Sequence, residues 1–144
     1  MHNYINYILS MIIVFSCIIQ LFAQNINLTV RVTNIKKING KVYIAIYDDK
    51  NSFLNPNKAV KTIELNVNNN ILKHTLSIPK GAYALALFHD SNSNGILDKN
   101  FLGIPSERYG FSNNVHPLFS EPSFNSTVIE IHKDLKIDIA LLKW

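Results

Sequence analysis

The chain has 144 residues, of which 14 are lysine or arginine and 10 are aspartate or glutamate, which gives a formal net charge of +4. This length suits one domain. The basic residues are scattered, with no run longer than two, so a solvated surface is expected rather than a stripe that binds nucleic acid. The composition therefore argues against a nucleic-acid partner.

An uncharged apolar run, residues 8–22, lies close to the N-terminus. It is short for a membrane span, which needs ~20 apolar residues, but it has the length of a signal-peptide core. Because Ala23 offers a small residue at a cleavage point, we predict that residues 1–23 are a signal peptide and that the protein is exported, to the periplasm or beyond the cell. An uncleaved anchor, or a lipid on Cys17, is the alternative. After cleavage the remaining chain would keep no cysteine and no stable membrane span.

Residues 24–144 alternate apolar and polar side chains in several stretches that are separated by turn residues. A period of two with one polar face is typical of antiparallel sheets, and no stretch has the period of a helix. The predicted strands are residues 26–32, 41–47, 60–67, 71–78, 83–89, 127–131 and 135–141. The sequence thus predicts an all-β fold, a single seven-stranded antiparallel β-sandwich with one long inserted loop, residues 90–122.

Turn residues and strand faces give finer predictions. Asn39-Gly40 accepts a positive φ and predicts a hairpin between the first two strands. The strand at 41–47 is apolar on both faces, which indicates a central position. His74 shares the apolar face of its strand, so we expect a half-buried structural histidine. A short helical turn is expected only near 53–58 or 106–109.

The long loop begins with a run of short, oxygen-bearing side chains. Counted from Asp90, the run matches the opening of a calcium-binding EF-hand loop, with side-chain oxygens at positions one, three, five and nine, a glycine at six and a backbone carbonyl at seven. The matching residues are Asp90, Asn92, Asn94, Gly95, Ile96 and Asp98. Calcium takes six to eight oxygens at about 2.3–2.6 Å, and short side chains at alternate positions can converge on one point.

The match fails at position twelve, where Phe101 replaces the bidentate glutamate, and no helices flank the loop. Glu107 is the nearest carboxylate down the chain that could supply the missing oxygens. One prediction is therefore a calcium site of modest affinity, ~10⁻⁴–10⁻³ M; magnesium is less suited because it tolerates irregular cages poorly. The alternative is a self-capped turn, in which Asp and Asn side chains bond their own backbone and the glycine takes a positive φ.

A set of short motifs resembles one known family. The motifs are Pro79-Lys80-Gly81-Ala82-Tyr83, Phe88-His89-Asp90, Asn94-Gly95, Leu97-Asp98, Gly103-Ile104-Pro105, Glu107 and Tyr109-Gly110-Phe111-Ser112-Asn113. Together they resemble the bacterial domain-of-unknown-function 2141 family over essentially the whole of residues 24–144. The resemblance implies an exported single-domain β-sandwich, immunoglobulin-like or transthyretin-like and similar to carboxypeptidase regulatory modules, with no established activity. The shared segment of the family falls here on Asp90, Asn94, Asp98, Gly103, Pro105, Glu107, Gly110, Ser112 and Asn113.

Side chains capable of hydrolytic chemistry lie within residues 89–116. They are His89, Asp90, Glu107, Ser112 and His116. A serine hydrolase needs its serine, histidine and carboxylate within hydrogen-bond reach, and the chain has no glycine-flanked nucleophile elbow. The two histidines also lack the short spacing of a zinc site, and His89 is expected to bond a loop carbonyl. We therefore predict a non-catalytic binding or accessory module. A metal-dependent or Ser/His hydrolase, or a purely structural envelope protein without an ion site, is the alternative.

Four aromatic residues lie in the chain after the possible calcium loop at residues 90–98. Tyr109, Phe111, Phe119 and Phe124 would, if exposed, form a surface for a carbohydrate or protein partner. The alternative is that these rings fold back and close the open end of the sandwich.

Overall fold

A computed structural model describes residues 5, 7, 11, 25–118 and 120–144. Apart from three positions, the predicted signal peptide at 1–23, including Cys17, lies outside the described residues, as does Phe119. No helix among the described residues is long and apolar enough to cross a membrane.

The described residues form eight strands and three short helical turns. The strands are β1 (Asn25–Thr33), β2 (Lys41–Tyr47), β3 (Lys61–Asn66), β4 (Leu72–Pro79), β5 (Gly81–Asp90), β6 (Arg108–Phe111), β7 (Ile129–Ile131) and β8 (Leu135–Ala140). The turns are η1 (Pro56–Lys58), η2 (Ser112–Asn114) and α2 (Phe124–Thr127). The all-β prediction is confirmed, and each of the seven predicted strands is present with its ends shifted by no more than two residues. The eighth strand, β6, lies inside the segment predicted to be a loop.

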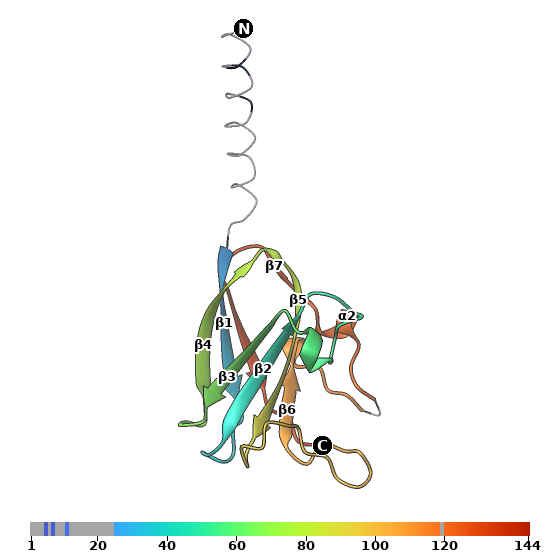
Figure 1. The fold of residues 1–144 in the computed structure, drawn as a ribbon. Helices are drawn as coiled ribbons and strands as arrows, with labels where there is room; N and C mark the ends of the chain where they lie inside the picture. The colour runs from blue at the N-terminus through green and yellow to red at the C-terminus, as the bar shows by residue number, and fades with distance from the viewer. Residues whose placement is uncertain (1–4, 6, 8–10, 12–24, 119) are drawn as a thin grey trace.

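The strands form two sheets, of which one has the order β4-β1-β8 and the other the order β3-β2-β5-β6, with β7 also pairing with β5 (Figure 1). β1 is antiparallel to β4 but parallel to β8, with Thr33 opposite Ala140. The prediction of wholly antiparallel pairing is therefore wrong. The reason is that the chain leaves β7 at the end where β1 starts, and Asp134 accepts a 2.9 Å hydrogen bond from the backbone N–H of Asn27 just before β8 begins.

The Asn39-Gly40 turn does not form the predicted hairpin. Gly40 has the expected positive φ of +70°, but β1 and β2 belong to different sheets. The turn carries the chain from one sheet to the other, and Ile35, which is buried in the core, fixes this crossing. β2 lies between β3 and β5, which confirms its predicted central position.

Both sheets contribute to one apolar core. Its fully buried members include Leu28, Val30, Val32, Val42, Ile44, Ile46, Leu85 and Ile139. These residues are largely the alternate positions that the period-two pattern assigned to one face, as expected for strands whose other face meets solvent. His74 is half-buried, as predicted.

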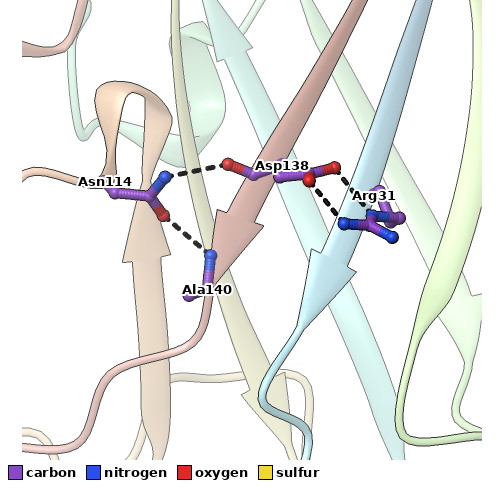
Figure 2. Close-up of polar contacts among 4 residues, drawn as sticks. All are labelled: Arg31, Asn114, Asp138 and Ala140. Atoms are coloured by element: carbon purple, nitrogen blue, oxygen red, sulfur yellow. Dashed lines mark hydrogen bonds and ion pairs between the residues drawn. The ribbon is translucent and has the colours of Figure 1, made fainter.

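A side chain closes the outer edge of β8. The amide of Asn114 donates to the carbonyl of Asp138 at 2.9 Å and accepts from the backbone N–H of Ala140 at 2.8 Å (Figure 2). These two bonds occupy one backbone C=O and one backbone N–H at the edge of β8, as a residue of a neighbouring strand would. They therefore leave fewer free backbone groups with which another chain could pair. The carboxylate of Asp138 pairs with Arg31 on β1, with Nε at 2.7 Å and Nη2 at 2.5 Å.

Four chain segments meet at one end of the two sheets, which we call the loop end. The pairing brings the ends of β1, β3, β5 and β8 together with the starts of β2, β4 and β6. The loop end consists of residues 34–40, 67–71, 91–107 and 141–144 and lies at the bottom of Figure 1, opposite the start of β1. Hydrogen bonds tie these segments to one another, including Asn39 Nδ2 to the carbonyl of Ser91 at 2.8 Å and Asn34 Nδ2 to the carbonyl of Leu141 at 2.6 Å.

Candidate functional site

The calcium-loop pattern predicted at residues 90–98, which we call the ion loop, begins at the last residue of β5 and lies at the loop end. His89 and Asp90 are buried, and Asp90 lies opposite Lys41 in the pairing with β2. Nε2 of His89 lies 2.8 Å from the carbonyl oxygen of Asn39, which confirms the predicted structural role of this imidazole. Gly40 allows the close approach, because a Cβ there would lie 2.0 Å from the carbonyl oxygen of Asp90.

The carboxylate of Asp90 is the centre around which the loop winds. It is fully buried, and its two oxygens accept hydrogen bonds from the backbone N–H groups of Asn94, at 3.1 Å, and Gly95, at 2.8 Å. Asn92 Oδ1 accepts from the N–H of Asn94 at 3.1 Å, and Asn94 Oδ1 from the N–H of Ile96 at 3.0 Å. These are the bonds that the self-capped turn predicts. Each oxygen keeps lone pairs, since an ionised carboxylate has about four acceptor sites.

Asp98 returns to the same group of side chains. Its carboxylate accepts from the side-chain amides of Asn92, at 2.7 Å, and Asn94, at 3.0 Å. Hydrogen bonds therefore connect all five predicted loop positions, with Ile96 held through its backbone N–H.

Glu107, the sixth predicted position, reaches the loop from outside. Its side chain is buried, and Oε1 accepts from the backbone N–H of Ser91 at 2.7 Å and from its hydroxyl at 3.2 Å. Oε2 accepts from the backbone N–H of Asp98 at 3.3 Å. Glu107 thus spans the two ends of the loop.

Lys41 lies opposite Asp90 in the pairing of β2 with β5, but its ammonium group pairs with Glu64 at 2.6 Å. In the described part of the chain, neither Asp90, Asp98 nor Glu107 forms an ion pair within 4.0 Å. No three Asp, Glu, His or Cys side chains of the described residues gather tightly enough to bind a metal by themselves. A cation here would therefore depend on amide and carbonyl oxygens as much as on carboxylates.

A small hairpin extends from the loop and was not predicted. Lys99 and Pro105 form a β-bridge, and the side chain of Asn100 accepts from the N–H groups of Leu102, at 2.9 Å, and Ile104, at 3.0 Å. Phe101 at its tip is 94% exposed and Leu102 is 66% exposed. Sequence reasoning noticed Phe101 only as a missing ligand; the turn signal was the Asn100 and Gly103 pair that flanks it.

The serine of the hydrolase alternative has no histidine partner among the described residues. Ser112 is fully buried, and its hydroxyl accepts from the N–H of Leu85 at 2.9 Å and donates to the carbonyl of Thr127 at 2.5 Å. His116 is exposed, and no hydrogen bond of the described residues joins Ser112 to a histidine. Ser112 links β5 to the last residue of α2.

The aromatic rings fold inward. Tyr109 and Phe111 are buried with ring centroids 5.8 Å apart, and burial raises the pKa of the Tyr109 hydroxyl. Phe124 packs edge-on against Phe53 at 5.8 Å. Of the two alternatives for these rings, folding back holds for the buried Tyr109 and Phe111, whereas Phe124 is half-buried.

Comparison with known proteins identifies a family. The family of uncharacterised proteins conserved in bacteria, domain of unknown function 2141, matches residues 30–138. The chain belongs to this family. The resemblance seen in the motifs is confirmed. In this member of the domain-of-unknown-function 2141 family, the match spans β2 to β7 and includes every residue of the ion loop and Glu107. No curated protein and no solved structure matches the chain.

Proposed function

We propose that the protein is an exported, non-catalytic binding module whose loop at residues 90–98 holds one calcium ion. The observation that carries the proposal is a pair of buried carboxylates: Asp90 is fully buried and Glu107 nearly so, and among the described residues neither forms an ion pair within 4.0 Å. Buried charges in proteins are normally paired with an opposite charge or coordinate a metal.

The chemistry of the oxygens favours calcium among the common cations. The ligands would be carboxylates of Asp90 and Asp98, amide oxygens of Asn92 and Asn94 and the carbonyl of Ile96. Hard oxygen donors of this mixed kind suit Ca²⁺, which accepts irregular cages of six to eight ligands. Glu107 already accepts three hydrogen bonds through its two oxygens, so about one acceptor site remains, and its main role would be to support the loop.

Calorimetric titration with calcium chloride tests the site. The unaltered protein should bind with Kd of ~10⁻⁴–10⁻³ M, the range of extracellular calcium modules. Asp98→Asn keeps the side-chain shape and removes a charge, so it should weaken binding clearly, and Asp90→Ala should abolish it. Asp134→Asn, at the other end of the sheets, is the matched control and should bind like the unaltered protein.

A second measurement guards against variants that fail to fold. Calcium well above Kd should raise the free energy of unfolding of the unaltered protein by about 1–3 kcal/mol, through binding to the folded state alone. Absence of both heat and stabilisation in the unaltered protein would leave the self-capped turn, and with it the structural envelope protein, as the better account.

Export is supported by the uncharged run at 8–22 and by Ala23, and cell fractionation with N-terminal sequencing tests it.

The non-catalytic assignment is supported by the use of the Ser112 hydroxyl for two backbone bonds. Turnover of ester or peptide substrates that Ser112→Ala abolishes without unfolding the protein would restore the hydrolase.

A further inference from the structure

Large apolar side chains that are exposed to solvent gather at the loop end. They are Ile38, Ile71, Ile96, Phe101, Leu102 and Trp144. Within residues 25–118 and 120–144, the remaining exposed side chains of this kind are Val60 and Leu118, which lie in other segments. Single exposed apolar residues are ordinary on a protein surface, but six on adjoining loops at one end are not.

The tip of this apolar group is held in a fixed shape. Phe101 and Leu102 occupy the centre of a turn closed by the bond from Gly103 N–H to the carbonyl of Asn100, at 2.9 Å. The N–H of Asn100 donates in turn to the carbonyl of Ile104 at 2.8 Å. Two large apolar side chains are therefore presented to solvent by an ordered turn, so that little conformational entropy would be lost when they are buried by a partner.

Exposed lysines accompany these residues on the same segments. They are Lys36, Lys37, Lys143 and Lys99, of which Lys99 lies 4.0 Å from the exposed carboxylate of Glu121. No exposed aspartate or glutamate side chain lies in the four segments of the loop end, because Glu107 is buried and Asp98 is half-buried. The surface that the loop end presents is therefore apolar and cationic.

We propose that the loop end docks on a lipid bilayer with anionic headgroups, with Phe101 and Leu102 entering the boundary between headgroups and acyl chains. Lysines beside exposed Phe, Leu and Trp side chains are typical of interfacial membrane binding, in which apolar burial adds to attraction for anionic lipid. A protein partner fits less well, because lysine is depleted at protein interfaces and the apolar residues here stand on separate loops. The proposal does not depend on calcium.

Trp144 is the single tryptophan of the chain and lies at the loop end, so its fluorescence reports contact with lipid at this place. The exported protein is titrated with phosphatidylcholine vesicles that do or do not contain phosphatidylglycerol. We expect the emission of Trp144 to shift to shorter wavelength with the anionic vesicles, and the shift to weaken as salt is raised.

Paired variants locate the contact. Phe101→Ser with Leu102→Ser should weaken vesicle binding at least ~10-fold by removing the buried apolar area. Lys36→Gln with Lys37→Gln should weaken it by about five-fold for each lysine. The matched controls at the opposite end, Val60→Ser and Lys50→Gln with Lys58→Gln, should bind like the unaltered protein. All these side chains are exposed, so the variants should fold.

A Trp144 emission that does not shift, or equal binding by tip and control variants, would overturn the proposal. So would equal binding to neutral and anionic vesicles. Binding that persists in a calcium chelator supports bilayer docking even if the calcium site fails, and binding that needs calcium supports both. A protein cross-linked through position 101, with no vesicle binding, would assign the loop end to protein docking instead.

Discussion

Oε1 of Glu107 lies 2.7 Å from the backbone nitrogen of Ser91, sixteen residues earlier in the chain. Its other oxygen reaches the backbone nitrogen of Asp98 at 3.3 Å. Glu107 immediately precedes β6, and the pairing of Arg108 with His89 fixes where that strand begins. The shape of the ion loop is therefore set by β6, a strand outside the loop itself.

Glu107→Gln should loosen both ends of the loop. The glutamine replaces one acceptor oxygen by an NH₂ group, so one backbone N–H loses its partner at a buried position. We expect a loss of about 1–3 kcal/mol in the free energy of unfolding and faster hydrogen exchange at Ser91 and Asp98. Urea denaturation and exchange measured by NMR check this. Glu121→Gln changes an exposed carboxylate 4.0 Å from Lys99 and should be nearly neutral.

Ser112→Ala should destabilise the fold without touching any exposed surface. The change leaves the N–H of Leu85 and the carbonyl of Thr127 without their buried partner. The expected loss is about 2–3 kcal/mol, since an unsatisfied buried group costs more than a hydrogen bond yields. Thermal and urea denaturation measure it. Ser77→Ala on the exposed face of β4 should change stability little, and equal effects of the two substitutions would contradict the buried link through Ser112.

The strands were predictable from the sequence because each long strand carries its own period-two pattern. β6 was not, because its four residues, Arg-Tyr-Gly-Phe, are too few to establish a period and include a glycine, which weakens isolated strands. The crossover at Gly40 was missed for a different reason. A local turn signal reports the φ of the turn but not which sheet the next strand joins, and that depends on packing far along the chain.

The candidate site was also predictable only in part. The spacing from Asp90 to Asp98 is local and predicts which side chains meet. Glu107 was named only as the nearest carboxylate, and its role in supporting the loop depends on β6. The exposure of Phe101 had no sequence signal, because an apolar residue in a loop is as easily buried as exposed.

Arg31→Met should change how the free energy of unfolding depends on pH in the acid range. Hydrogen bonding to Arg31 holds the pKa of Asp138 below its ordinary value of 3.8. A lowered pKa in the folded state adds stability that is present above the unfolded value and is lost as the pH falls through the folded one. The variant should raise the pKa of Asp138 towards 3.8 and flatten the loss of stability below that pH. Carboxyl NMR titration checks this, with Asp134, whose pKa is lowered by Asn27, as the internal control.

Asn114→Asp should open half of the β8 edge. Aspartate keeps an acceptor for the N–H of Ala140 but cannot donate to the carbonyl of Asp138, and it adds a negative charge beside that carbonyl. We expect a loss of about 1–2 kcal/mol. Asn114→Gly removes both bonds but tolerates the φ of +50°, so a larger loss than in the aspartate variant would show that the side-chain bonds, not the backbone, matter here. Denaturation curves for the two variants decide between them.

Gly40→Ala and Gly103→Ala should differ sharply although both glycines have positive φ. At Gly103, with φ +77°, an added Cβ meets nothing within 4 Å, so the cost is the left-handed backbone alone, about 1–2 kcal/mol. At Gly40 the Cβ would lie 2.0 Å from the carbonyl oxygen of Asp90, so β2 and β5 must separate where the ion loop begins. We expect a loss above about 4 kcal/mol, or no folded protein. Expression level and urea midpoints measure both variants. Similar midpoints would mean that the loop end gives way around Gly40, and that Asp90 is not held as rigidly as the proposed calcium site requires.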